Sequence, residues 1–125
     1  MRKNGSKSEL SIKSKLLFNN LDMHMRVFLD LTQKDEKRIK SLNTIFQTYE
    51  MTLRPFVEDE AKEYQEKVWT KIDEKHKEIE DMIVSKITVE TLNMIVSPIL
   101  ADLKNMVSTC KTNLDTVNAL WKIDG

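Results

Sequence analysis

The chain has 125 residues, in which 20 Lys and Arg balance 20 Asp and Glu and 40% of the residues are hydrophobic. This length and balance predict one soluble globular domain. Two Gly, two Pro and one Cys are too few for an all-β fold, a disulfide scaffold or a cysteine-ligated zinc site. The sequence shows no apolar run long enough for a signal peptide or a membrane span. We therefore expect an intracellular protein, cytoplasmic rather than nuclear.

The net charge changes sign along the chain. Residues 1–53 carry ten basic and six acidic side chains, whereas residues 54–90 carry seven basic and eleven acidic ones. The first segment is therefore +4, the second is −4, and the remaining residues are neutral. Opposite charges favour packing of the two halves against each other, or head-to-tail association of two chains, over attraction to a polyanion.

The first residues predict a tail and then a helix. Residues 1–7 hold one apolar residue and are expected to be a disordered basic tail, while residues 8–125 are expected to form a single helical-bundle domain. Ser6 and Glu9 have the spacing of a capping box, from which a first helix should run to about Leu31. From Leu16 to Leu31, ten of sixteen residues are apolar. A helix that is apolar on all sides must be covered by other helices or by another subunit.

Thr32, with Asp35 three residues later, is a second capping signal, which opens a new helix or continues the first. The apolar residues of this segment alternate at spacings of three and four, which is typical of a coiled-coil seam. They are Ile39, Leu42, Phe46, Tyr49, Leu53 and Phe56. Arg54-Pro55 is interpreted as a helix junction, because proline suits a first helical turn and Glu58–Glu60 would complement the positive end of a helix dipole.

The third helix is expected to run from Pro55 to about Lys86. Its apolar residues recur every eleven positions, as in the row Val57, Val68 and Ile79, which predicts a straight or slightly right-handed helix. Beyond Thr88 a heptad returns with three apolar rows, a face wide enough to contact at least two neighbouring helices. One of these rows is Leu92, Ile99, Met106, Asn113 and Leu120.

These segments together predict an all-α fold: an antiparallel bundle of three or four long helices with coiled-coil-like seams. The helix count stays open because Thr32, Thr88 and Pro98 could each mark a break or a bend. Pro98 either starts the last helix or kinks it. Asn113 places an amide in a seam, where such a residue commonly fixes register, so its replacement by Leu should raise thermal stability.

No motif in the sequence carries specific chemistry. His76 forms a single carboxylate–imidazole pair with Asp73, whereas a di-iron bundle needs two such pairs, and Cys110 lies in an apolar row. We expect no enzyme activity, metal, cofactor or small-molecule substrate. The basic residues Arg2, Lys3, Lys7, Lys13 and Lys15 give only a weak signal for nucleic-acid binding, because no aromatic residue lies among these charges to stack on a base.

One local sequence pattern has a known counterpart. The segment Leu-Arg-Pro-Phe-Val-Glu-Asp-Glu-Ala-Lys at residues 53–62, with the eleven-residue rows that follow, resembles a proline-punctuated repeat of the exchangeable apolipoproteins. The resemblance implies amphipathic helices that lie on a lipid surface. Membrane contact belongs to this alternative only.

The main functional prediction is a non-enzymatic protein–protein interaction module. Its apolar seams would be completed by a second copy of the chain or by a partner helix. Large aromatic residues dominate contact energies, so the expected anchors are Phe28, Phe46, Tyr49 and Trp121. The other interpretation is that these four residues form the core of a single chain. Asn113 would set the register of the contact.

Overall fold

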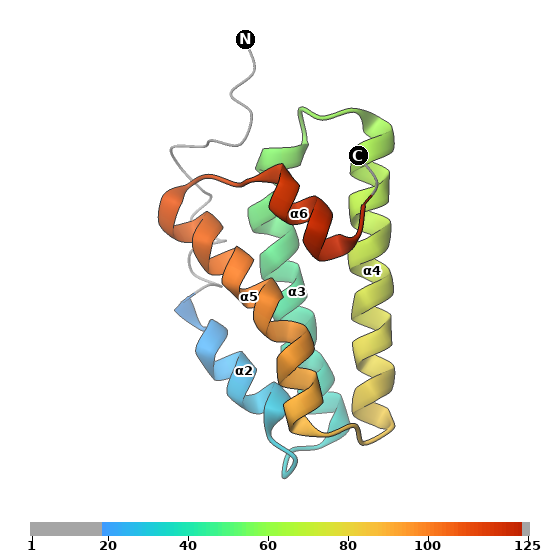
Figure 1. Ribbon diagram of the computed structural model, residues 1–125. Coiled ribbons are helices and arrows are strands. Elements are labelled where there is room, and N and C mark those ends of the chain that lie inside the picture. Colours follow the sequence, from blue (N-terminus) through green and yellow to red (C-terminus); the bar gives the residue numbers. More distant parts are fainter. Residues whose placement is uncertain (1–18, 124–125) are drawn as a thin grey trace.

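The computed structural model describes residues 19–123, and this part of the chain forms five helices and no β-strand (Figure 1). The helices are α2 (Leu21–Leu29), α3 (Asp35–Val57), α4 (Lys62–Val84), α5 (Val89–Thr109) and α6 (Leu114–Trp121). The expected all-α class is confirmed. None of the helices in residues 19–123 combines the length and apolar character needed to cross a bilayer. The expected basic tail and the capping box of Ser6 and Glu9 lie outside the described residues.

Helix α3 is the centre of the structure. Helices α2, α4 and α5 all pack against it, and consecutive helices from α2 to α5 run in alternating directions (Figure 1). The short helix α6 lies across one end and contacts both α5 and α4. Where three or four long helices were expected, the described residues form three long ones and two short ones.

The apolar row of α3 explains its central position. Five of the six residues in the row are buried (Leu42, Phe46, Tyr49, Leu53 and Phe56), and Ile39 is partly buried. Helix α4 contributes one face, made of Val68, Ile72, Ile79 and Ile83, all fully buried. All five helices supply residues to one continuous core within the described chain. Each such side chain stabilises the fold by roughly 1.5–3 kcal/mol through removal of apolar surface from water.

Within residues 19–123 of the single chain, helix α2 is covered on one side only, so the other described helices do not supply the expected cover on all sides. Leu21 and Phe28 are buried, but Met23 is exposed. The helix ends because the Asp30 carboxylate accepts hydrogen bonds from the Thr32 backbone N–H at 2.9 Å and from its hydroxyl at 2.6 Å. Thr32 therefore belongs to the turn, and the residue at the N-cap of α3 is Lys34.

The junction between α3 and α4 lies after Pro55, not at it. Pro55 sits in the last turn of α3, which continues to Val57, and α4 begins only at Lys62. Pro55 removes one hydrogen bond and its ring crowds the carbonyl of Met51, but both effects fall near the end of α3, where few further turns depend on them. Val57 consequently belongs to α3, and the eleven-residue row from Val57 to Val68 crosses a loop.

Thr88 marks a true break, whereas Pro98 does not. The Thr88 hydroxyl oxygen accepts a hydrogen bond from the Thr91 backbone N–H at 3.3 Å and caps the N-terminus of α5. Pro98 lies inside α5, which continues from Val89 to Thr109. It therefore does not start a helix.

The expected position of Asn113 in a helix seam is wrong. Helix α5 ends at Thr109, and Cys110 follows with a left-handed backbone, φ 54°. Asn113 is the N-cap of α6, where its side-chain oxygen accepts a hydrogen bond from the Asp115 backbone N–H at 2.8 Å. The heptad spacing of apolar residues continues in the sequence across this loop, although the helix does not. The Asn113 amide therefore caps a helix and does not interrupt a seam.

Candidate functional site

The four aromatic residues expected to bind a partner are all buried within the single chain. Phe28, Phe46, Tyr49 and Trp121 are each at most 4% exposed. The structure brings three of them together: the Trp121 ring centroid lies 5.5 Å from that of Tyr49 and 6.4 Å from that of Phe46. In this conformation the four side chains form the core, so they could contact a partner only if the bundle opened.

Two of these aromatics join a buried chain of hydrogen bonds. The Trp121 Nε1–H donates to the Tyr49 hydroxyl oxygen at 3.0 Å, and the Tyr49 hydroxyl donates to Asp102 Oδ2 at 2.5 Å. Burial raises the pKa of Asp102, an effect partly offset by the hydrogen bond from Tyr49. Burial, followed by the nearby Asp102 charge, raises the pKa of Tyr49, so its hydroxyl remains a proton donor. These two hydrogen bonds link α6 to α3 and α3 to α5.

Asp102 was not singled out by the sequence prediction. Its position carried a usable signal, since it lies three residues after Ile99 and four before Met106, on the buried face of α5. A carboxylate on such a face needs a buried donor. That donor comes from Tyr49, which is 53 residues away in sequence.

A cavity of about 520 Å³ between α5 and α6 is bordered by Asp102. The other lining residues are Pro98, Ala101, Asn105, Thr116, Ala119 and Leu120. None of these can act as an acid or base near neutral pH, so the lining holds a single carboxyl group with no catalytic partner. Asp102 is therefore best explained as an acceptor that orients Tyr49 and Trp121.

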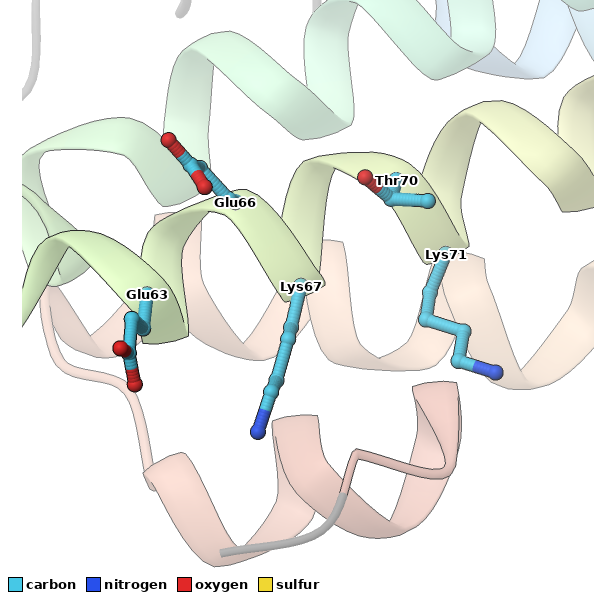
Figure 2. Close-up of a pocket in the computed structure, with 5 residues that line it drawn as sticks. All are labelled: Glu63, Glu66, Lys67, Thr70 and Lys71. Carbon is cyan, nitrogen blue, oxygen red and sulfur yellow. The ribbon is translucent and has the colours of Figure 1, made fainter.

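The surface of α4 has a shallow hollow of about 310 Å³, shown in Figure 2. Its five lining residues come from this one helix, and the side chain of Lys67 extends toward α6 (Figure 2). Two of them, Glu63 and Glu66, are acidic, and Lys67 and Lys71 are basic. Mixed charges on an exposed helix face favour solvation over selective binding.

His76 is a boundary residue. Its ring stacks on Phe46 with centroids 4.7 Å apart, and its Nε2 atom lies 2.5 Å from the Asn43 side-chain amide and 3.5 Å from Glu80. Asp73 pairs with Lys77 at 3.6 Å. No group of three or more residues suited to a metal ion occurs in residues 19–123.

The clearest surface feature is at one end of the bundle, where the α2–α3 and α4–α5 loops meet (Figure 1). Lys86 Nζ in the second loop lies 2.7 Å from Asp35 Oδ1 at the start of α3. We call this region the basal end. Two large apolar side chains are exposed there, Leu31 (61%) in the α2–α3 loop and Val84 (59%) at the end of α4, and Met94 (74%) is exposed in the second turn of α5. Met23, the fourth among the described residues, lies in the first turn of α2.

The basal end therefore combines exposed apolar side chains with an ion pair that fixes two loops together, and it is the candidate site. Comparison with protein-family models, with curated proteins and with solved structures finds no match to this chain, and we therefore infer function from its residues alone.

Proposed function

We propose that this protein is a non-enzymatic helical interaction module that associates with a second copy of itself through the basal end. The observation that carries the proposal is the exposure of Leu31 and Val84 at the basal end and of Met94 in the second turn of α5, while the apolar core residues of the neighbouring helices are buried. Association would remove these side chains from water, a gain that scales with the apolar area covered.

Charge at the basal end is compatible with a second copy as the partner. The α2–α3 loop carries one acidic and one basic side chain, Asp30 and Lys34, and the α4–α5 loop carries one basic side chain, Lys86. In a two-fold dimer these loops can face each other without bringing together a large charge of one sign.

The burial of the α3 row moves the proposed contact away from the expected seam. Leu42, Phe46 and Tyr49 already have partners on other helices of the same chain. The basal end needs no opening of the bundle, so a self-association through it is compatible with the core described above.

The test is the mass of the purified chain, measured by size-exclusion chromatography with light scattering over a hundredfold concentration range and at two salt concentrations. We expect the mass to rise above 14.7 kDa with concentration. Val84→Glu places a charge in the proposed contact and should keep the chain monomeric. Met23→Lys changes an exposed methionine outside the basal end and should associate as the unmodified chain does.

A constant mass of 14.7 kDa at all concentrations would overturn self-association. Equal effects of Val84→Glu and Met23→Lys would show that the contact lies elsewhere. Lipid binding, the alternative from the apolipoprotein resemblance, requires α4 to expose Val68 and Ile79, which are fully buried. Clarification of a phospholipid suspension by a constant monomer would favour that alternative.

A further inference from the structure

A cavity of about 440 Å³ lies at the basal end, between the α2–α3 turn and the start of α5. Its apolar lining consists of Leu31, Ile87 and Val89, and its basic lining of Arg38 and Lys86. This volume falls within the range of small-molecule sites, which is roughly 300–1,000 Å³. The cavity is formed within one chain, but Leu31 lines it and also belongs to the proposed contact with a second copy. The titrations below therefore use the Val84→Glu chain, which is expected to stay monomeric and to leave Leu31 uncovered.

Arg38 is the unusual residue of this lining. It is 1% exposed, and its Nε–H donates a hydrogen bond to the Phe28 carbonyl oxygen at 2.8 Å, which fixes the guanidinium group. Its Nη2 atom is buried and has no hydrogen-bond partner in the structure. A buried charged donor without a partner is costly, so an acceptor that reached Nη2 from the cavity would be bound favourably.

No neighbouring acidic side chain supplies that acceptor. Hydrogen bonds from Thr32 are the main cause that lowers the pKa of Asp30, and the Arg38 charge is the smallest contribution. Its carboxylate oxygens accept from Thr32 and Gln33. Asp35 is paired with Lys86.

The start of α5 adds a second attraction for an anion. Thr88, Val89 and Glu90 line the cavity and form the N-cap and first turn of this 21-residue helix. The Thr88 side chain accepts the Thr91 N–H, but the first two N–H groups of a helix have no acceptor within it. Together with the helix dipole they favour a negative group. The exposed Glu90 carboxylate is the opposing charge in the lining.

From these observations we propose that the basal cavity binds a small monocarboxylate with a short branched apolar tail. The carboxylate would accept a hydrogen bond from Arg38 Nη2 near the N-terminus of α5, and the tail would contact Leu31, Ile87 and Val89. A planar carboxylate matches a guanidinium group, and a single charge is repelled less by Glu90 than the double charge of a phosphate. The ligand is bound, not converted.

The test titrates the full-length Val84→Glu chain with 4-methylpentanoate, followed by backbone amide NMR shifts, with 4-methylpentanamide as the neutral ligand of the same shape. We expect millimolar affinity for the acid, at least about tenfold weaker binding of the amide, and shifts centred on residues 86–90. Equal binding of acid and amide would overturn the proposal, as would no binding of either.

Variants identify the groups that hold the carboxylate. Arg38→Met should weaken binding of the acid at least about tenfold, whereas Lys37→Met, a neighbouring exposed lysine that does not line the cavity, should leave it unchanged. Glu90→Gln should tighten binding, because it removes the opposing charge. If Arg38→Met fails to fold, Arg38→Lys keeps a charge without the planar fork and should still weaken binding. Unchanged affinity in the folded Arg38 variant would place the ligand elsewhere.

A carboxylate next to a branched apolar group occurs in free small acids and also at the C-terminus of a peptide that ends in leucine. N-acetyl-leucine, compared with N-acetyl-leucinamide, represents a peptide that ends in leucine. Tighter binding of N-acetyl-leucine than of 4-methylpentanoate would identify a peptide C-terminus as the source. The reverse order would identify a free acid.

Discussion

At the scale of single residues, the Tyr49–Asp102 hydrogen bond is the main polar contact of the core. Tyr49 is fully buried and Asp102 is 6% exposed, so neither group can replace its partner with bulk water. Losing one partner would leave the other unsatisfied, which typically costs about 1–3 kcal/mol. The contact therefore holds α3 and α5 in one relative position.

Asp102 should make stability depend on pH in an unusual direction. Burial raises its pKa in the folded chain above the ordinary value of 3.8, so the folded state binds this proton more readily than the unfolded state. The contribution of Asp102 to stability is then largest at low pH and falls as pH rises from about 3.8 through the folded pKa. In Asp102→Asn this decrease of stability with rising pH should be absent, because the amide does not titrate.

The measurement is the free energy of unfolding by urea at several pH values from 3.5 to 7, for the unmodified chain and for Asp102→Asn. We expect the stability of the unmodified chain relative to Asp102→Asn to decrease as pH rises. Asp81→Asn removes one exposed carboxylate and controls for the change in net charge. A difference between the two chains that stays constant or increases with pH would contradict the raised pKa of Asp102.

The sequence singled out the large aromatic residues, as anchors for a partner or as core residues, but not their polar partners. Tyr49 and Trp121 stand out because large apolar side chains at helical spacing can be recognised locally. The spacing of Asp102 from Ile99 and Met106 indicates its buried position, but its donor Tyr49, 53 residues away, cannot be recognised locally. Arg38 bonds the Phe28 carbonyl oxygen, which no side-chain pattern reveals.

At the scale of helices, the sequence predicted the interior of each segment better than its ends. The predicted C-terminus of α4, near Lys86, is confirmed to within two residues, and Thr88 caps α5. The start of α4 was wrong because Pro55 and the acidic residues after it resemble a helix N-terminus, although α3 continues to Val57. The break before α6 was missed because heptad spacing continued across residues 110–113.

The capping role of Asn113 reverses the expected effect of its replacement. Asn113→Ala removes the acceptor for the Asp115 N–H, and it should lower the free energy of unfolding by about 1 kcal/mol. Asn113→Leu should also lower stability, whereas a seam position would have predicted an increase. Thermal and urea unfolding followed by circular dichroism measure both.

Two variants provide the control for this cap. Asn113→Ser keeps an oxygen acceptor and should retain most of the stability. Asn105→Ala changes an exposed asparagine inside α5, where alanine is the better helix former, and it should not destabilise the chain. A more stable Asn113→Leu variant would contradict the capping role.

At the scale of the whole molecule, the question is whether the aromatic row of α3 serves the core or a partner. Phe46 is 1% exposed and contacts both His76 and Trp121. Phe46→Ala should therefore cost about 3–5 kcal/mol of stability, by loss of burial and formation of a cavity. Urea unfolding with the helical signal as readout measures this cost.

The control for Phe46 is Met23→Ala, which shortens a 47% exposed side chain outside the basal end and should change stability by less than about 0.5 kcal/mol. A near-normal melting temperature for Phe46→Ala would contradict its place in the core. The sequence left both interpretations of the row open. It could not choose between them because periodicity shows that a face is apolar, and not which helix covers it.

The position of α6 gives the chain two different tryptophan environments. Trp121 is buried and its indole N–H is hydrogen-bonded to Tyr49, while Trp69 is half-buried with the Arg54 guanidinium 5.1 Å above its ring. The fluorescence of Trp121 should thus lie at shorter wavelength than that of Trp69. In a Trp69→Phe chain, the emission wavelength would report directly whether Trp121 of α6 is packed against Tyr49 of α3, including any partial opening in which the rest of the bundle stays folded.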